Sequence, residues 1–326
     1  MTTKPFLLWK LPHVARKQVL DYMDPMELIF LTFMSKHIKY SAFGLLEADK
    51  FSWTVMNNLK VIEVISKDRT NRKFKMNFQI TQVPPNNKTI KLKNRKIPFK
   101  ASKKTFNLKS EKNEEDNISI LDDLTEHLLV IFKIAEYGLH SEFNLFDSPI
   151  FKNTKRFSEL QLNNQDLTVE HTRTLLETME IDFLTLYLTR PKIKKGPEDF
   201  QLKHNIMKLG NVDWLKFSSV LNMKCEELIL GRMNHITQKD FSDFVRVWSE
   251  GGFENLTSFY VQVPHVWEQR DIDMSYLWRN EVYESFKSMD LTIVKATRNG
   301  DEKTIQRNDG KRAEILFKNF FKFKVL

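Results

Sequence analysis

The residues that most often carry chemistry stand far apart in this sequence. The single cysteine, Cys225, directly precedes Glu226 and Glu227, whereas a nucleophilic thiol needs an electropositive, partly exposed site. None of the eight histidines pairs with another histidine or with the cysteine at a spacing typical of metal ligands. We therefore expect a buried or bystander thiol, and we expect no metal site.

Carboxylates do occur side by side, in Glu114–Asp116 and in Asp122–Asp123. Adjacent residues of a helix point to different sides, so these groups favour a solvated helix entry, where negative charge also complements the helix dipole. The sequence contains no GxSxG, P-loop or GxGxxG motif. We expect a protein that is not an enzyme and has no cofactor. A carboxylate pair gathered from distant segments is the open alternative.

The bulk composition is that of a folded protein. The chain has 326 residues, of which 41% are apolar, and 26 are phenylalanine. This length favours two domains, or one domain and a small module. No apolar run approaches the ~18 residues of a membrane span, Phe6–Trp9 is too short for a secretory signal, and a lone cysteine fits a reducing compartment. We expect a cytoplasmic or nuclear protein without membrane contact.

The formal net charge of +9 is concentrated in one segment. Residues 67–112 hold 15 lysines and arginines against two carboxylates. Such a segment could bind nucleic acid or an acidic partner, and exposed strand faces also carry lysine without any partner. The phenylalanines of this segment could stack on bases, but their spacing also suits a core.

The amino-terminal segment predicts two helices. Pro12 suits a first helical turn, and apolar residues follow at helical spacing up to Met23. Asp24 and Pro25 are a strong start signal for a second helix, in which Glu27 stands where a capping carboxylate belongs. This second helix is apolar on most sides, and a module of about 40 residues is too small to bury it alone. We infer two buried faces, one in the protein's own core and one against a partner.

The next segment, from about residue 51 to 112, changes to short, partly alternating runs. Three or four strands of an antiparallel sheet are expected, at "KVIEVIS", "RKFKMNFQI", "TIKLKN" and "KTFNLKS". A polar connector at 111–117 follows. A helix then carries apolar residues from Ile120 to Ala135, and Gly138 is its expected carboxyl-terminal cap.

The second half contains a recurring unit of a strand followed by a helical pattern. The strand-like segments stand 22 to 30 residues apart. Their central residues are Leu160, Leu184, Ile206, Leu228 and Ser258. The clearest helix is Thr237–Trp248, with Gly251 after it. This period is typical of a leucine-rich-repeat-like stack, so we expect an irregular β-α solenoid, with an ordinary α/β sandwich as the alternative.

The last residues again predict strands. Asn308-Asp309-Gly310 stands between two extended runs and predicts a hairpin turn, and "FKFKVL" alternates as a half-buried terminal strand does. The expected fold class is therefore mixed α+β/α/β. It begins with a helical module, continues with a β-rich segment and ends in an irregular leucine-rich-repeat-like β-α domain.

The stretch "LPHVARKQVLDYMDPMELIFLTFMSKHIKYS" resembles an F-box. It has a Leu-Pro entry, an Asp-Pro start of the second helix and a Ser-Lys element that ends it. The opening of the chain is similar to that of the large nematode F-box family. The remainder resembles that family's type 2 F-box-associated domain, through "DFSDFVRVWSEGGFENLTSFYV" and the closing "TIQRNDGKRAEI".

This resemblance implies two domains. Residues 1–47 would be the adaptor-binding helical F-box, and 48–326 the substrate-binding F-box-associated domain, with antiparallel strands at 48–112 and the β-α part at 113–326. The implied function is that of a non-catalytic substrate-recognition subunit of an SCF-type E3 ubiquitin ligase. It would link a protein substrate to a Skp-type adaptor, and through it to cullin and RING subunits. A nucleic-acid-binding or general protein-interaction module that uses 67–112 is the alternative.

The resemblance also implies adaptor contacts at the matching motif positions. These are Leu11, Pro12, Val19, Leu20, Met23, Pro25, Leu28, Leu31 and Lys36. For Val19, Leu20 and Leu28, packing inside the module is as strongly expected as adaptor contact. Leu11, Pro12 and Pro25 are the strongest candidates for contact. The sequence singles out no substrate-binding residue.

Overall fold

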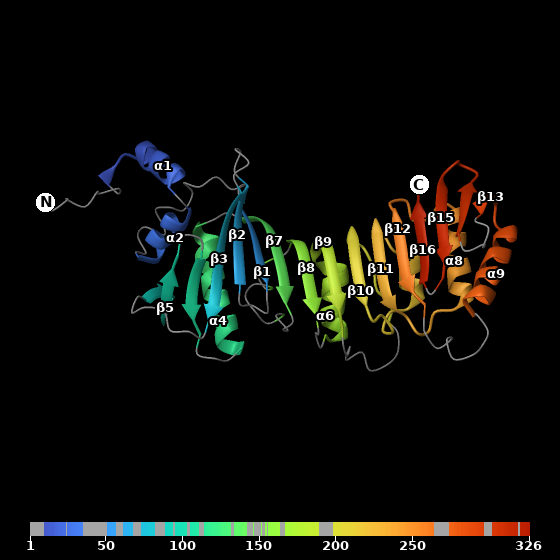
Figure 1. Cartoon of the computed structure of the whole chain (residues 1–326), viewed down its shortest axis with the longest axis horizontal. Helices are drawn as coiled ribbons and strands as arrows, with labels where there is room; N and C mark the ends of the chain where they lie inside the picture. Colours follow the sequence, from blue (N-terminus) through green and yellow to red (C-terminus); the bar gives the residue numbers. More distant parts are fainter. Residues whose placement is uncertain are drawn as a thin grey trace. The chain divides into compact units, whose positions relative to one another are not determined.

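The structure is a computed structural model in which the chain forms two compact units (Figure 1). Unit 1 comprises Met1–Ser141 and Leu145–Thr154, and unit 2 comprises Glu142–Asn144 and Lys155–Leu326. The residues that the structure describes are 10–23, 25–34, 51–56, 61–67, 73–81, 89–93, 95–102, 105–110, 114–131, 134–141, 146, 151, 154, 156–163, 167–188, 198–263, 274–296, 302–318 and 320–326.

Unit 1 combines a twisted sheet with helices. Its elements in chain order are α1 (His13–Tyr22), α2 (Pro25–Met34), β1 (Phe51–Met56), β2 (Val61–Lys67), β3 (Lys73–Thr81), β4 (Thr89–Leu92), β5 (Arg95–Ala101), β6 (Thr105–Lys109), α4 (Glu114–Ile131) and β7 (Ile134–Ser141). The strand order is β7-β1-β2-β3-β6-β5-β4. Neighbours are antiparallel except for two parallel pairs, β1 with β7 and β3 with β6.

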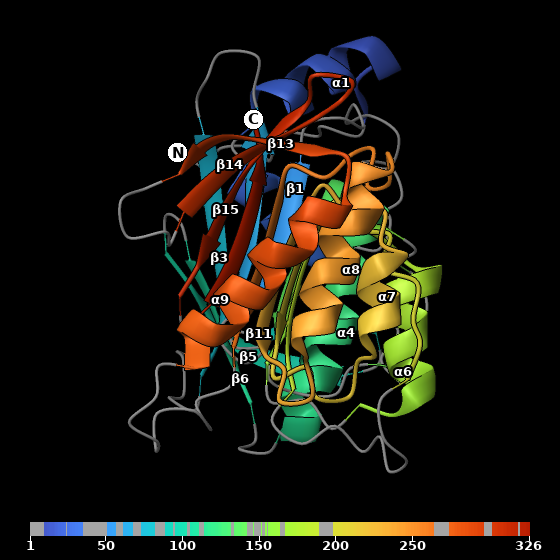
Figure 2. The same cartoon turned by 90° about the vertical axis from the view of Figure 1, so that its right-hand side faces the viewer.

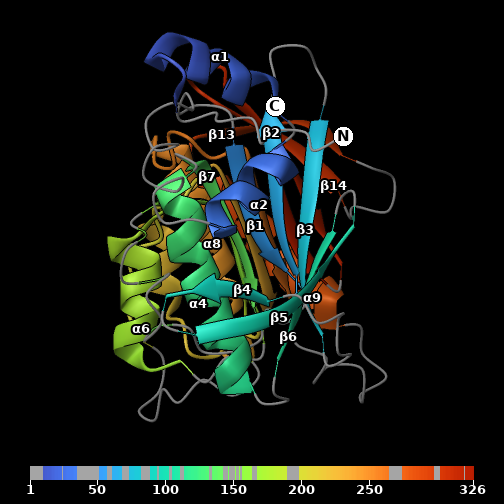
Figure 3. The ribbon, with the colours of Figure 1, turned by 90° about the vertical axis from the view of Figure 1, so that its left-hand side faces the viewer.

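The core of unit 1 lies between α4, α2 and the strands β4–β6 (Figure 3). Every second side chain of β4 and β6 is buried, as expected for strands with one covered face. The ring of Phe78 stacks on that of Phe106 with centroids 5.2 Å apart. Leu121, Leu124 and Leu128 of α4 are fully buried. The apolar side of α4 and the buried faces of β4 and β6 therefore form one core.

Unit 2 is also built on a sheet. Its elements are β8 (Arg156–Asn163), α6 (Val169–Arg173), η3 (Thr174–Thr178), β9 (Glu180–Tyr187), β10 (Ile206–Gly210), α7 (Phe217–Leu221), β11 (Glu227–Arg232), α8 (Gln238–Ser249), β12 (Ser258–Gln262), α9 (Met274–Ser285), η5 (Phe286–Ser288), β13 (Leu291–Ala296), β14 (Glu302–Arg307), β15 (Arg312–Phe317) and β16 (Phe320–Val325). The strand order is β13-β14-β15-β16-β12-β11-β10-β9-β8. Strands β8–β12 are parallel, and β12–β16 pair antiparallel.

The helices of unit 2 lie along one side of its sheet (Figure 2). The buried face of α8 packs on the central strands, where the ring of Phe244 lies 4.5 Å from that of Phe259 and 5.2 Å from that of Phe323. Trp248 follows one turn later and is buried against the same Phe323 ring, at 5.2 Å. Large aromatic side chains therefore fill the space between helix and sheet.

Several local predictions are confirmed in unit 2. The helix predicted at Thr237–Trp248 is α8, and Gly251 follows it with φ of 97°. The structure adds a capping box of Thr237 and Asp240 at the start of α8. Gly310, with φ of 86°, lies in the turn that joins β14 to β15. The terminal strand β16 alternates buried and exposed residues as expected.

Gly138 does not cap the helix that precedes it. Helix α4 ends at Ile131, and Gly138 lies in β7 opposite Thr54 of β1. A Cβ at this position would lie 2.8 Å from Oγ1 of Thr54. The glycine therefore serves a close approach of two strands, which the local sequence pattern does not reveal.

The predicted fold class is wrong. The structure is mostly β-sheet with few, mostly short helices, and no separate helical domain is evident among the described amino-terminal residues. Helix α2 packs on β4 and α4, so strands of the same unit cover its apolar side. The β-α alternation also ends with α9, because the chain then returns through the antiparallel strands β13–β16 on the β12 edge. Helices α6 and α7 have only five residues each.

The predicted domain boundary at 47/48 falls within 35–50, outside the described residues. The division by function between 1–47 and 48–326 therefore stays a prediction. Within the described part of the chain, no helix is both long and apolar enough to cross a membrane.

Candidate protein-interaction surfaces

The predicted adaptor contacts begin just before α1. Pro12 is exposed and immediately precedes the first turn, and Leu11 beside it is half-buried. Two further apolar side chains of α1 are open to solvent: Val14 is 69% exposed and Tyr22 is 92% exposed. The start and end of α1 therefore present apolar groups that unit 1 leaves largely uncovered.

The other predicted contacts differ in burial. Val19, Met23 and Leu31 are half-buried. Leu20 is only 1% exposed, so in this structure it contributes to packing. Pro25 and Leu28 lie in α2, but their side chains are outside the described structure, as is the whole of Lys36. Adaptor contact by any member of the set stays a prediction.

One side of α2 is buried in unit 1. Ile29 is fully buried, and the ring of Phe33 stacks on His127 of α4 with centroids 4.5 Å apart. The Phe33 ring also meets Phe106 edge-on at 6.0 Å. The hydroxyl of Thr32 donates to the carbonyl of Ile29 at 2.7 Å and lies 3.1 Å from Nε2 of His127. The expected core-facing side of this apolar helix is thus present, whereas its partner-facing side stays a prediction.

A second surface is the face of the unit 2 sheet opposite its helices, which we call the open face. In β10, β11 and β12 the residues that point toward the helices are buried, and those between them are half-buried. Strand register aligns the open-face residues in continuous rows. One row consists of Gln161, Thr185, Lys208, Ile229, Tyr260 and Lys322, of which Thr185 is buried. The parallel strands therefore present polar and apolar side chains in an ordered array.

Aromatic side chains stand out on the open face. The rings of Tyr260 and Phe320 lie 5.2 Å apart on neighbouring strands. Nζ of Lys208 lies over the ring of Phe183, 4.8 Å from its centroid, which is a cation–π geometry. Aromatic residues at the centre of an exposed surface are the type that contributes most to protein binding.

Tyr187 is the most exposed aromatic residue described on the open face, with 48% exposure. Its ring lies against Gly210 on the next strand, where an added Cβ would come within 2.1 Å of Cδ1 of Tyr187. In the adjacent strand, a Cβ at Gly231 would lie 3.0 Å from the Gly210 Cα. The absence of side chains at Gly210 and Gly231 thus lets the Tyr187 ring pack on β10 and lets β11 approach β10 closely.

A hollow adjoins this array on strands β14–β16. It is lined by Glu302, Glu314, Leu316, Lys322 and Lys324. Charges of both signs therefore surround one aliphatic side chain. This composition suits contact with a polar protein surface better than enclosure of an apolar small molecule.

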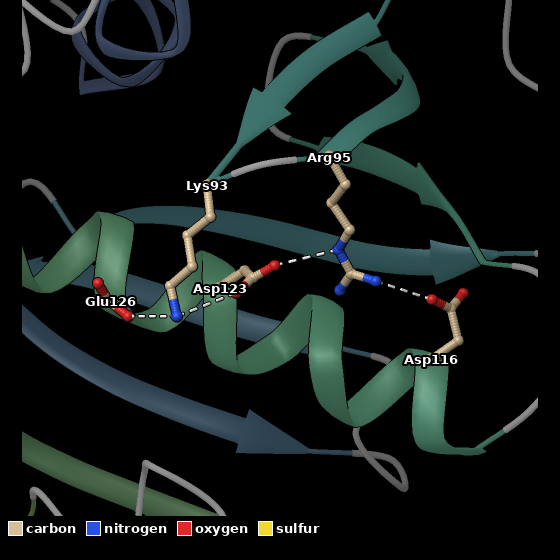
Figure 4. A network of polar contacts seen from close by, with 5 residues as sticks. All are labelled: Lys93, Arg95, Asp116, Asp123 and Glu126. Carbon is tan, nitrogen blue, oxygen red and sulfur yellow. Dashed lines mark hydrogen bonds and ion pairs between the residues drawn. The ribbon is translucent and has the colours of Figure 1, made fainter.

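The basic segment 67–112 is partly neutralised within unit 1 (Figure 4). Lys93 binds Glu126 at 2.6 Å and Asp123 at 3.3 Å. Arg95 binds Asp123 through Nε at 3.1 Å and Asp116 through Nη1 at 3.0 Å. The hydrogen bond to Glu126 is the main cause of the raised pKa of Lys93. These two cations tie the β4–β5 turn to α4 and are not free for a partner.

The adjacent carboxylates Asp122 and Asp123 do not form a solvated helix entry. Both lie in the middle of α4 and are half-buried. Burial, and then the neighbouring charge of Asp123, raises the pKa of Asp122 to about 6. Oδ1 of Asp122 is buried without a hydrogen-bond partner. Asp123 thus forms ion pairs, whereas Asp122 is buried without a partner for Oδ1. Sequence spacing alone could not predict this difference, because it depends on which side of α4 the β4–β5 turn covers.

The single thiol is buried, as predicted. Sγ of Cys225 lies 3.5 Å from the carbonyl oxygen of Leu202 and 3.4 Å from the sulfur of Met207. Burial raises the pKa of the Cys225 thiol to about 12. Among the described residues, no three His, Cys, Asp or Glu side chains gather as a potential metal site.

The sequence pattern marked Ile206 and Ser258 of the open face only as centres of strand-like segments, and it predicted no binding residue there. Buried and less buried residues alternate along much of the two predicted strands that contain Tyr187 and Tyr260, and each tyrosine directly follows or precedes a buried residue. This alternation is the sequence signal that could have placed both tyrosines on the exposed face. Their proximity to Gly210 and Phe320 depends on strand order. A single sequence with an imperfect repeat does not supply that order.

This chain was compared with curated proteins, with solved structures and with protein-family models. The first two comparisons found no match. Residues 198–261, which contain β10, α7, β11, α8 and all but the last residue of β12, match the family model described as F-box associated.

Proposed function

We propose that this protein is a substrate-recognition subunit of an SCF-type E3 ubiquitin ligase. The observation that carries the proposal is the F-box-associated match over 198–261. That segment forms the centre of the unit 2 sheet and supplies Lys208, Ile229 and Tyr260 to the open face. A rigid sheet that carries exposed aromatic and charged side chains is suited to contact a protein substrate.

The adaptor half of the proposal assigns the α1–α2 segment to a Skp-type adaptor. The F-box resemblance of residues 11–41 supports this assignment. The exposed Pro12, Val14 and Tyr22 provide apolar area for such a contact. Through the adaptor, cullin and RING subunits would join the assembly.

In this role the chain performs no chemistry of its own. It acts by holding a substrate near the ubiquitin-loaded conjugating enzyme, which raises the effective concentration of the two reactants. The buried thiol supports a non-catalytic role, because the thiolate is the nucleophile and a pKa of about 12 leaves Cys225 almost fully protonated at neutral pH.

Binding of a purified Skp-type adaptor to the full chain tests this proposal. We expect the wild type to bind, and Leu11→Ala/Pro12→Ala to weaken binding about tenfold, since loss of a central interface contact typically costs ~1–2 kcal/mol. The matched control is Gln18→Ala/Glu27→Ala, which removes two exposed polar side chains of the same helices.

Two results would count against the proposal in different ways. Equal binding of both variants would show that the adaptor does not contact the predicted face. Failure of the wild-type chain to bind any Skp-type adaptor would remove the ligase function itself.

A further inference from the structure

The strands β4–β6 of unit 1 have two faces of opposite character. Ile90, Leu92, Ile97 and Phe99 are buried on the face where β4 contacts α2 and α4 (Figure 3). The residues between them point the other way, since side chains alternate along a strand. We call this side the outer face. Its described members are Thr89, Lys91, Lys96, Pro98, Lys100, Thr105, Asn107 and Lys109.

Within the described part of the chain, no ion pair compensates the positive charge of the outer face. Lys91 and Lys96 are both exposed and stand directly opposite each other in the β4–β5 ladder. Like charges in such a pair destabilise a sheet. Lys100 is exposed on the same face, and the described outer-face residues include no carboxylate. The α4 carboxylates of Figure 4 are held by Lys93 and Arg95 from the turn.

We propose that the outer face of β4–β6 binds an acidic protein segment in extended conformation. Lys96 and Lys100 lie on one strand four residues apart, which is about 13 Å of extended chain. An extended acidic segment laid along β5 can match this spacing with carboxylates four residues apart. The negative charge of such a segment would reduce the repulsion between Lys91 and Lys96, and its carboxylates would form ion pairs with Lys96 and Lys100.

The observations favour a protein segment over nucleic acid. Phe99 and Phe106, which could have stacked on bases, are buried on the inner side. The guanidinium of Arg95 is engaged by α4. The outer face therefore offers lysines, threonines and an asparagine without an aromatic platform. This inference goes beyond the proposed ligase role, because binding on the outer face does not depend on an adaptor.

The test measures fluorescence anisotropy of a labelled ten-residue peptide of alternating Glu and Ser with the full chain at about 50 mM salt, where exposed ion pairs are weakly screened. The variant is Lys91→Gln/Lys96→Gln/Lys100→Gln. The matched control, Lys224→Gln/Lys239→Gln/Lys318→Gln, removes three exposed lysines of unit 2 and leaves the same net charge.

We expect the control to bind like the wild type and the outer-face variant to bind about tenfold more weakly, which corresponds to about 1.4 kcal/mol. Thermal unfolding should show the outer-face variant at least as stable as the wild type, since repulsion is removed. The single variant Lys96→Gln should bind more weakly than the wild type and more tightly than the triple variant.

Three results would overturn the inference. Equal weakening in both triple variants would mean that the peptide responds to net charge alone. Absence of binding by the wild type at low salt would mean that the face has no affinity for acidic peptide. Stronger competition by a single-stranded DNA of equal charge than by unlabelled peptide would assign the face to nucleic acid.

Discussion

At the scale of residues, helix α4 shows how neighbours in sequence acquire different roles. Asp123 accepts ion pairs from Lys93 and Arg95, whereas Oδ1 of Asp122 is buried without a hydrogen bond. The pKa of Asp122 is raised to about 6, first by burial. Because its pKa is higher in the folded chain than in the unfolded chain, this carboxyl destabilises the fold when it is ionised.

Substitution of Asp122 should therefore stabilise the protein in a pH-dependent way. Between pH 4 and 6 the folded state binds more protons than the unfolded state, so the destabilisation by Asp122 grows as the pH rises through this window and is complete above it. We expect Asp122→Asn to add about 1 kcal/mol to the free energy of unfolding at pH 7.5, a value discounted for partial solvent screening. The gain should fall away toward pH 4.

Urea unfolding of the variant at several pH values measures this effect. Asp123→Asn is the matched control, and it should lower stability because it removes the partner of Lys93 and Arg95. A gain that stayed constant from pH 4 to 7.5 would contradict the assigned cause.

At the scale of elements, helices and strands whose signals are local were predictable from sequence. Helix α8 is the clearest case, since Thr237 before it, the three- and four-residue spacing of its aromatic face and the glycine after its end all lie within 15 residues of sequence. Strand β5 was not foreseen, because Pro98 argues against a strand interior and only pairing with β4 and β6 reveals it. The sequence pattern therefore misses strands that form only through pairing with strands elsewhere in the sequence.

The contribution of the capping box of α8 to stability can be measured directly. The backbone N–H and the hydroxyl of Thr237 each donate to Oδ2 of Asp240 at 2.7 Å, and the N–H of Asp240 donates to the Thr237 hydroxyl at 3.4 Å. We expect Thr237→Ala to lower the free energy of unfolding by about 1 kcal/mol, because the N–H of Asp240 loses its acceptor and the Asp240 carboxylate loses the hydroxyl donor.

Chemical denaturation followed by circular dichroism gives this value. Lys239→Ala, at an exposed position of the same helix, serves as the control and should change stability by less than about 0.5 kcal/mol. If the two substitutions were equally mild, the cap would not contribute to the stability of unit 2.

At the scale of the whole molecule, the sequence indicated most strands but not the architecture. The five strand-like segments of the second half are the parallel strands β8–β12. The return of the chain through β13–β16 was only partly foreseen, and α9 not at all. Helix α2 appeared to require a helical module because its apolar residues were counted without the strands that cover Ile29 and Phe33. Burial by distant strands is a property of topology, which periodicity does not encode.

The rate at which Cys225 is alkylated reports on the packing of unit 2, because this residue is the only thiol of the chain and is buried there. Burial raises the pKa of its thiol from 9.0 to about 12, which lowers the thiolate fraction at pH 8 about 1,000-fold. We expect iodoacetamide to alkylate the native chain at least this much more slowly than the chain unfolded in urea. The protection should disappear over the same urea concentrations at which the far-ultraviolet dichroism of the protein is lost, because the thiol becomes accessible only when its packing against Leu202 and Met207 is lost. Rapid alkylation of the native chain would show that the core around Cys225 opens without global unfolding, and would contradict this expectation.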